Sequence, residues 1–283
     1  MPPAGPEQCG YVPEKVLGRG GSATVYLARR GADSTPVALK VLDTEHTEHT
    51  DARIRLEREF AFARRVDHRH VVTMYEHGPD WLAMQYVDGG DIGHLGSDRR
   101  MRALAQIADG LDHTHRAGIV HCDVKPTNIL VHRDFEAGGA VLIDFGVAHS
   151  LAQDMAIRLS HDPMSRLSLD PARRITRHPE HREPLIHASL PYAAPELLLG
   201  RMPAGGTDLY ALACTAVELL TGAPPFPAGS ANELIEAHLD RLPPPTGLAR
   251  GVDSVLAKAL AKDPEARYGT CQEFIDALVR ALR

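Results

Sequence analysis

The first third of the chain alternates short apolar runs with turns, and each run has the length of a β-strand. Five such runs, at residues 11–18, 24–30, 36–42, 70–78 and 81–87, predict a mostly antiparallel sheet. One helical pattern interrupts them, because positions 52, 56, 59, 63 and 66 share one helix face. Four of these positions are apolar and the fifth is Glu59. An isolated buried carboxylate is costly, so we expect Glu59 to meet a cation inside the fold.

The remainder of the chain has a helical pattern. After the glycine-containing stretch "DGGDIGHLGSD", helices are predicted at residues 101–117, near 207–221 and at 269–283. We therefore expect an α+β fold with two lobes. A β-rich N-terminal lobe covers about residues 11–86, an α-helical C-terminal lobe covers about residues 87–283, and a crease lies near residues 85–91.

Composition and charge exclude several classes of protein. At 283 residues, with 43% hydrophobic and 24% charged residues, the chain has the composition of a soluble globular protein. A net charge of −6 argues against a nucleic-acid partner. The most apolar stretch, residues 209–220, is too short to span a bilayer, and no signal-peptide pattern opens the chain. We therefore expect a cytoplasmic location and no membrane contact from this chain itself.

The cysteines and histidines give no metal or disulfide pattern. Four cysteines are far apart and form no C-x-x-C pair: Cys9, Cys122, Cys214 and Cys271. Neither a disulfide framework nor a zinc knuckle is indicated. Histidine-rich stretches such as "HTEH", "HRH" and "HPEH" invite a metal site, but they lack Cys or acidic partners at fixed spacing, so solvated histidines are the preferred interpretation.

The segment "LGRGGSATVYLAR" carries Gly18, Gly20 and Gly21 between two predicted strands. Glycines allow backbone amides to approach phosphate oxygens, although an ordinary glycine-rich hairpin explains this segment equally well. A dinucleotide-binding turn is disfavoured because a strand, rather than a helix, follows the glycines. Lys40 ends the run "VALK", either as a solvated residue or as the cation for Glu59.

Three further motifs follow in order: "HCDVKPTN" at residues 121–128, "DFG" at 144–146 and "APE" at 194–196. This order and spacing is that of protein kinases. From about residue 11 to 280 the chain resembles the bacterial branch of eukaryotic-like (Hanks-type) serine/threonine protein kinases. The resemblance implies a bilobal kinase fold over residues 1–283, with a nucleotide cleft between the lobes. It also implies ATP and Mg²⁺ as cofactors, Mn²⁺ as a substitute, protein Ser/Thr hydroxyls as substrates, and a role in bacterial signalling.

The resemblance assigns catalytic roles to Lys40, Glu59, Asp123, Lys125 and Asn128. Asp123 would accept the proton of the substrate hydroxyl, and Lys125 would stabilise charge on the transferring phosphoryl group. Lys40, fixed by Glu59, would hold the α- and β-phosphates of ATP. The setting of Lys125 in D-x-K-P is similar to that of the serine/threonine class.

The same resemblance implies where the nucleotide and its metal bind. Asn128 and Asp144 would be the Mg²⁺ ligands. The nucleotide would contact Gly18, Arg19, Gly20, Gly21, Val25, Ala38, Lys40, Met84, Gln85, Val87, Leu130 and Asp144. The glycine segment would cover the triphosphate, and the backbone of residues 85–87 would bind adenine.

Five further residues match structural positions of the family. Asp208, near the start of an apolar helix, would tie that helix to the loop that contains Asp123, and an acidic group there suits the helix dipole. Glu196 and Arg267 would form a buried ion pair. His121 and Phe145 would stack in the core, which makes His121 part of the scaffold rather than an acid or base.

The chain departs from the family pattern in two main ways. Cys122 stands where most regulated members have an arginine that binds a phosphate on the activation segment. We therefore predict activity without such a phosphate clamp, and a small buried filler is preferred over a redox role for Cys122. The activation segment, residues 144–196, is long, and it contains the candidate autophosphorylation sites Ser160, Ser165, Ser168, Thr176 and Ser189.

Several alternatives stay open at this stage. A pseudokinase would use the same fold only for binding, and it is disfavoured because the residues whose loss would mark it are all present: Lys40, Glu59, Asp123, Asn128 and Asp144. A small-molecule kinase of the aminoglycoside phosphotransferase type is disfavoured by Lys125, the "APE" motif and Asp208. The resemblance also leaves a homodimer through the N-terminal lobe as a candidate assembly, and a longer membrane kinase as a candidate parent protein.

Overall fold

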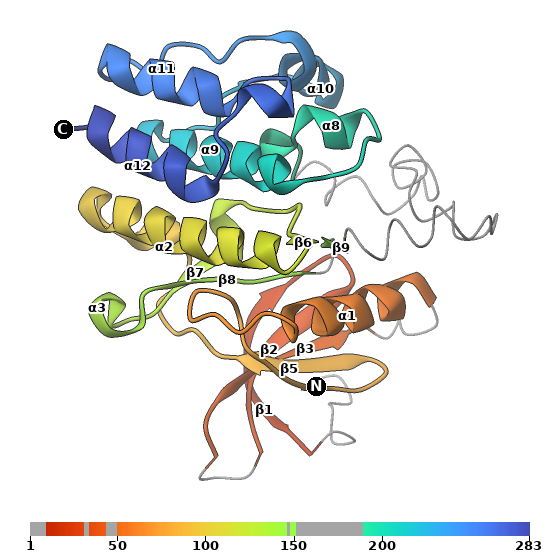
Figure 1. The fold of residues 1–283 in the computed structure, drawn as a ribbon. Coiled ribbons are helices and arrows are strands. Elements are labelled where there is room, and N and C mark those ends of the chain that lie inside the picture. The colour runs from red at the N-terminus through yellow and green to blue at the C-terminus, as the bar shows by residue number, and fades with distance from the viewer. Residues whose placement is uncertain (1–9, 31–33, 44–49, 146–147, 151–188) are drawn as a thin grey trace.

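The computed structural model describes residues 10–30, 34–43, 50–145, 148–150 and 189–283. The first part of the chain forms a five-stranded antiparallel sheet in the order β1-β2-β3-β5-β4 (Figure 1). Its strands are β1 (Val12–Arg19), β2 (Ala23–Arg29), β3 (Val37–Leu42), β4 (Met74–His77) and β5 (Trp81–Gln85). The register places Lys40 between Val25 on one side and Leu82 on the other. The predicted sheet is confirmed.

Helix α1 (Thr50–Ala63) packs against β4 and β5. The helix face predicted from the sequence is the buried one, since Ala52, Leu56, Glu59, Ala63 and Val66 are all at most 6% exposed. Glu59 is only 1% exposed, so a carboxylate does lie in this apolar interface. Its cation is described with the site below.

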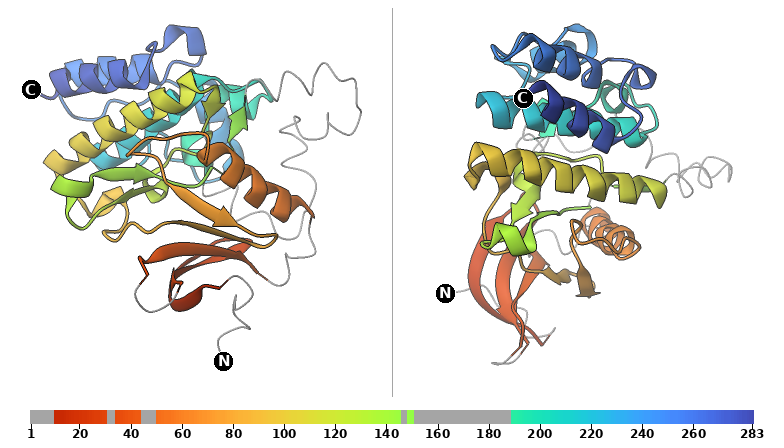
Figure 2. Two further views of the ribbon diagram at one scale, coloured as in Figure 1. Left: turned by 60° about the horizontal axis from the view of Figure 1, so that its bottom comes forward. Right: turned by 60° about the vertical axis from the view of Figure 1, so that its left-hand side comes forward.

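The second part of the chain is mainly helical and is built around α9 (Gly205–Thr221), which is buried along most of its length. Helices α2 (Ser97–Arg116) and α12 (Cys271–Ala281) lie side by side and both contact α9 (Figures 1 and 2). Helix α9 ends at Gly222, whose left-handed φ of 86° suits glycine. Ser230 and Thr270 cap the N-termini of α10 (Ala231–Asp240) and α12 through their side-chain oxygens.

The remaining elements are short, and they lie either within the helical part or between it and the sheet. They are η3 (Ile92–His94), β6 (Ile119–Val120), η4 (Pro126–Asn128), β7 (Ile129–Val131), α3 (Phe135–Gly138), β8 (Ala140–Leu142), β9 (His149–Ser150), η5 (Leu190–Tyr192), α8 (Pro195–Leu198), α10 (Ala231–Asp240), α11 (Arg250–Ala259) and η6 (Pro264–Ala266). Strands β7 and β8 pair and contact η3 and α2 respectively, so they bridge the helical part and the sheet (Figure 1). The expected α+β class with a sheet lobe followed by a helical lobe is confirmed.

Two predicted boundaries are wrong, for identifiable reasons. Strand β4 begins at Met74 instead of residue 70, because Val71 and Val72 turn towards β8: Val71 bridges to Leu142, and the Val72 amide donates to the Leu142 carbonyl. Helix α2 begins at Ser97 instead of residue 101, because its first turn, "SDRR", carries no apolar signal. Among the described helices, none combines the length and the apolarity needed to cross a membrane.

Candidate active site

Residues 121–128, here called the aspartate loop, hold the Asp123 carboxylate from two sides. Lys125 Nζ donates to Asp123 Oδ2 at 2.8 Å, and Asn128 Nδ2 donates to the same oxygen at 2.9 Å and to the Asp123 carbonyl at 2.8 Å. Lys125 Nζ also donates to Ser189 Oγ at 2.9 Å. Pro126 starts the short η4 turn, which places Asn128 back over Asp123. Three of the predicted catalytic residues therefore meet on one loop.

The buried Asp208 carboxylate anchors this loop to α9. Its Oδ1 accepts from the Cys122 amide at 2.7 Å, and its Oδ2 accepts from the His121 amide at 2.8 Å and contacts His115 Nε2 at 2.7 Å. Burial opposes ionisation of this carboxyl, yet its bonds to His115 and His121 hold the pKa of Asp208 below its ordinary value. The anchoring role predicted for Asp208 is confirmed.

Cys122 has a φ of 65°, in the left-handed region that non-glycine residues rarely adopt. The Cys122 amide donates to Asp208, and this hydrogen bond offsets the free-energy cost of the left-handed backbone conformation. The thiol of Cys122 is half-buried and lies 3.7 Å from the Val120 carbonyl.

The sequence interpretation missed His115, which lies on α2 and contacts Asp208. The only sequence signal for this residue is its position a few residues before the aspartate loop.

Lys40, Glu59 and Asp144, here called the lysine cluster, form the second half of the site. Lys40 Nζ lies 2.7 Å from Glu59 Oε2 and 3.5 Å from Asp144 Oδ1. The three groups come from β3, α1 and the segment after β8. The cation predicted for Glu59 is therefore Lys40.

Burial opposes the charge on Lys40, but the neighbouring carboxylates of Asp144 and Glu59 raise its pKa above the ordinary value. Burial raises the pKa of Glu59, and the Lys40 charge offsets part of that rise. The pair thus keeps a cation in a half-buried position, where the side chains of Lys40 and Asp144 are 20% and 40% exposed. A half-buried cation of this kind suits a polyanionic ligand.

The groups predicted to hold Mg²⁺ offer the oxygen ligands that this ion requires. The Asn128 amide nitrogen is used in bonds to Asp123, which leaves its oxygen as an acceptor. The Asn128 carbonyl accepts from the Ile143 amide at 2.9 Å, which brings the residue before Asp144 against the aspartate loop. This donor set fits a hard divalent cation.

The apolar residues predicted around adenine belong to one hydrophobic cluster. Ala38, Met84 and Val87 are buried in it, and Val25 and Leu130 pack against it. The main-chain amide of Gln85 donates to the Thr73 carbonyl at 2.8 Å. In the glycine segment, β1 contains Gly18 and ends at Arg19. The Gly20 amide then donates to the Ala23 carbonyl at 2.8 Å, and Gly21 lies in the same turn.

The predicted structural pairs are also present. Arg267 donates to both Glu196 oxygens, at 2.8 and 2.9 Å, and Thr207 Oγ1 donates to one of them at 2.8 Å. The rings of His121 and Phe145 meet edge to face with centroids 4.7 Å apart. His121 is fully buried, as expected for a scaffold residue.

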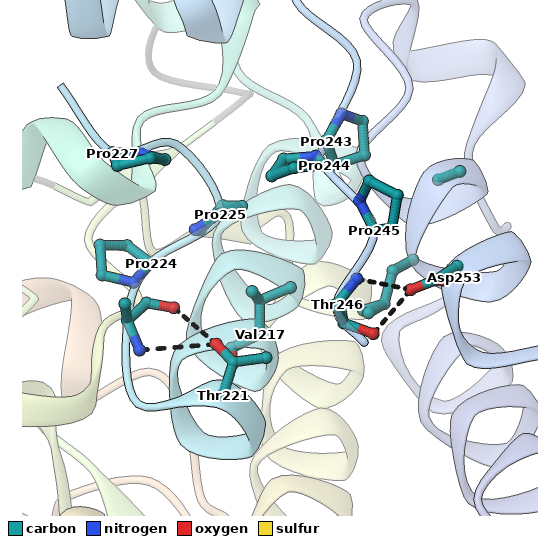
Figure 3. A pocket seen from close by; sticks show the side chains of 13 residues that line it. Val217, Thr221, Pro224, Pro225, Pro227, Pro243, Pro244, Pro245, Thr246 and Asp253 are labelled. Carbon is teal, nitrogen blue, oxygen red and sulfur yellow. Dashed lines mark hydrogen bonds between the residues drawn. The ribbon is translucent and has the colours of Figure 1, made fainter. Parts of the chain in front are cut away.

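Four of the candidate phosphorylation sites lie outside the described residues: Ser160, Ser165, Ser168 and Thr176. A separate cavity of about 270 Å³ lies between α9 and α11 (Figure 3). It is lined by Val217 and Thr221 and by prolines 224, 225, 227 and 243–245, and it contains none of the predicted site residues.

Comparison with known proteins agrees with this geometry. The model of the protein kinase domain family matches residues 11–278. Serine/threonine-protein kinase PknJ of Mycobacterium tuberculosis is 36% identical over 99% of this chain and 46% of PknJ. Serine/threonine-protein kinase PknF of the same organism is 33% identical over 95% of this chain and 56% of PknF. The chain thus spans about half the length of these curated relatives.

Solved structures give the same result. The crystal structure of the M. tuberculosis PknI kinase domain superposes with a TM-score of 0.67 at 29% identity, covering 96% of this chain and 95% of that domain. The family model, the relatives and the two halves of the site agree, and the chain belongs to the protein kinase domain family.

Proposed function

We propose that the chain is an ATP-dependent serine/threonine protein kinase domain, which transfers the γ-phosphate of ATP to Ser or Thr hydroxyls of proteins. The observation that supports this most strongly is the pairing of the lysine cluster with the aspartate loop. The lysine cluster supplies a half-buried cation and the aspartate loop supplies a fixed carboxylate, and the Asn128 carbonyl joins the two through the Ile143 amide. Phosphoryl transfer needs little more from a protein than such positioning and charge neutralisation.

On the acceptor side, the hydroxyl of the substrate would donate its proton to Asp123. The carboxylate is fixed by Lys125 and Asn128 and its side chain is 14% exposed, so a hydroxyl can reach it. Lys125, 2.8 Å from Asp123, would stabilise the charge on the phosphoryl group as it moves to the attacking oxygen. Its bond to Ser189 would keep the segment before "APE" next to the acceptor.

On the nucleotide side, Lys40 would bind the α- and β-phosphates while Glu59 fixes its position. The apolar cluster around Ala38 and Met84 would take the adenine ring, and the turn at Gly20 would cover the phosphates. Mg²⁺, when bound, neutralises phosphate charge, and Asn128 and Asp144 would hold it through oxygen atoms. Mn²⁺ would substitute for it because it also accepts oxygen ligands.

The proposal also covers the domain bounds, autophosphorylation, the location of the domain and its assembly. Residues 1–283 would form one kinase domain, with the N-terminal lobe at about 11–86 and the activation segment at 144–196. We expect autophosphorylation, and activity that needs no phosphate clamp because Cys122 replaces the arginine. The domain would act in the cytoplasm, alone or as part of a longer membrane kinase. The exposed side chains of Val12 and Val16 on β1 are candidate contacts for a homodimer through the N-terminal lobe.

A steady-state assay tests the proposal with ATP, Mg²⁺ and a mixture of Ser/Thr peptides. We expect transfer by the unmodified chain, and a loss of about 10²- to 10⁴-fold in Asp123→Asn, because the general base is removed while side-chain size is kept. Asp98→Asn, an exposed residue in the first turn of α2, is the matched control and should keep full activity.

The same assay separates the alternatives. A pseudokinase would bind ATP without transferring phosphate to any acceptor, and Asp123→Asn would then change nothing. A small-molecule kinase would label an aminoglycoside-type acceptor and leave the peptides unlabelled. Either result would overturn the proposed protein substrate class.

A further inference from the structure

Three side chains outside the proposed active site meet between α2 and α12. Asp112 and His115 lie one turn apart near the end of α2, and Cys271 is the first residue of α12. One potential ligand atom from each residue lies within 4.8 Å of the other two. His115 Nδ1 is 3.9 Å from Asp112 Oδ1. An imidazole nitrogen, a carboxylate oxygen and a thiol sulfur are the three donor types that Zn²⁺ binds in proteins.

The orientation of His115 is that of a metal ligand. Its Nε2 contacts the buried Asp208 carboxylate at 2.7 Å, so Nε2 is the donor in this contact and Nδ1 is the nitrogen left for a metal ion in the neutral form of the ring. Nδ1 lies on the side of Asp112. Gly205 of α9 packs closely on the ring, since a Cβ at that position would stand 3.0 Å from Nδ1 and the ring would have to shift. Carboxylate–histidine pairs of this kind orient the ring in metal centres.

The other two groups are held just as firmly. The amides of Cys271 and Gln272 donate to the two oxygens of Asp112, at 2.9 and 3.0 Å. Cys271 is 1% exposed, whereas the side chains of Asp112 and His115 are 11% and 17% exposed. An ion can therefore reach the cluster from solvent, and the sulfur would lie on its buried side. Burial, together with the nearby carboxylates of Asp112 and Asp208, raises the pKa of the Cys271 thiol, so the ion itself must displace the proton when it binds.

We propose that Asp112, His115 and Cys271 form a binding site for a divalent transition-metal ion of the Zn²⁺ class, with water as the fourth ligand. The mixed nitrogen, oxygen and sulfur donors select such ions over Mg²⁺ and Ca²⁺, which prefer oxygen alone. Binding breaks the Cys271 S–H bond, forms a sulfur–metal bond and releases the proton to solvent. The ion would join α2 to α12 and, through His115 and Asp208, stiffen the support of the aspartate loop.

Co²⁺ is the probe of choice, because a thiolate ligand gives a sulfur-to-cobalt charge-transfer band in the near ultraviolet that histidine or carboxylate sites lack. The full chain, reduced and stripped with a chelator, is titrated with Co²⁺. We expect one equivalent to produce the band and Zn²⁺ to abolish it by displacement. Cys271→Ser should lose the band and bind at least about tenfold more weakly.

Cys122→Ala is the matched control, since Cys122 is the half-buried thiol of the aspartate loop and should not contribute to the band. His115→Gln, a second variant, should also weaken Co²⁺ binding if Cys271→Ser proves unstable. Zn²⁺ should raise the melting temperature of the unmodified chain and of Cys122→Ala but not of Cys271→Ser. The proposal is overturned if the unmodified chain shows no band, if the band survives in Cys271→Ser, or if it disappears in Cys122→Ala. None of these readouts depends on kinase activity.

Discussion

His238 on α10 makes the stability of the helical lobe depend on pH. The ring is fully buried, its Nδ1 is 2.9 Å from the Tyr210 hydroxyl, and it meets the Phe226 ring edge to face at 4.9 Å. Burial, with a contribution from the Lys262 charge, lowers the pKa of His238 from 6.5 to about 4. The folded chain therefore excludes a proton that the unfolded chain accepts.

The sign and size of the effect follow from linkage. Below pH 6.5 the unfolded chain protonates His238 and the folded chain does not, so the free energy of unfolding falls as pH falls from 6.5 towards 4. At about 1.4 kcal/mol per pKa unit, the full loss is roughly 3 kcal/mol, complete once the pH is below the folded pKa. Above pH 6.5 this residue contributes no pH dependence.

Urea unfolding followed by circular dichroism at several pH values between 7 and 4.5 measures this effect. In His238→Gln, whose amide can still bond to Tyr210, we expect the decline in unfolding free energy with falling pH to be shallower by up to about 1.4 kcal/mol per pH unit. His94→Gln, with a side chain that is 69% exposed, is the control and should follow the unmodified chain. Parallel pH profiles for the unmodified chain and His238→Gln would refute the reasoning.

Three further predictions concern the loop anchor, the buried ion pair and the missing phosphate clamp. Asp208→Asn removes the charge of the carboxylate that accepts hydrogen bonds from the His121 and Cys122 amides. The free energy of unfolding should therefore fall by about 3 kcal/mol, and kcat should fall with it. Chemical denaturation and steady-state kinetics check this, and an unchanged stability would contradict the anchoring role. Arg267→Lys loses the bidentate hydrogen bonding to Glu196, so the free energy of unfolding should fall by about 2 kcal/mol in the same denaturation experiment. A change near zero would mean that the buried pair adds nothing beyond charge. Phosphatase treatment should leave turnover almost unchanged because Cys122 cannot bind a phosphate as arginine does, and a many-fold loss would show that another group does so.

The sequence carried different amounts of information about different parts of the site. Helical periodicity alone placed Glu59 in a buried face, and the need for a cation then pointed to Lys40, so this pair was predictable from physical reasoning. The ion pair between Glu196 and Arg267 joins residues 71 positions apart, and only the family resemblance brought them together. A local sequence pattern cannot pair two residues that are so far apart in the chain.

Other features follow from packing that no local pattern reports. His115 supports Asp208 and faces Cys271 only because α2, α9 and α12 converge, and the cysteine spacing gave no hint of a shared site. Strand β4 starts late because Val72 bonds to β8 rather than to its neighbour in the sheet. In both cases long-range packing, which is invisible in the order of residues, decides the local structure.

Phosphosite mapping by mass spectrometry tests the central claim most directly. The purified chain is incubated with Mg-ATP and a protein acceptor, in parallel with Asp123→Asn, and all modified residues are identified. The account predicts phosphoserine and phosphothreonine on the acceptor and on the chain itself, and almost none with Asp123→Asn. Absence of phosphate from every hydroxyl, or equal labelling by the variant, would contradict it.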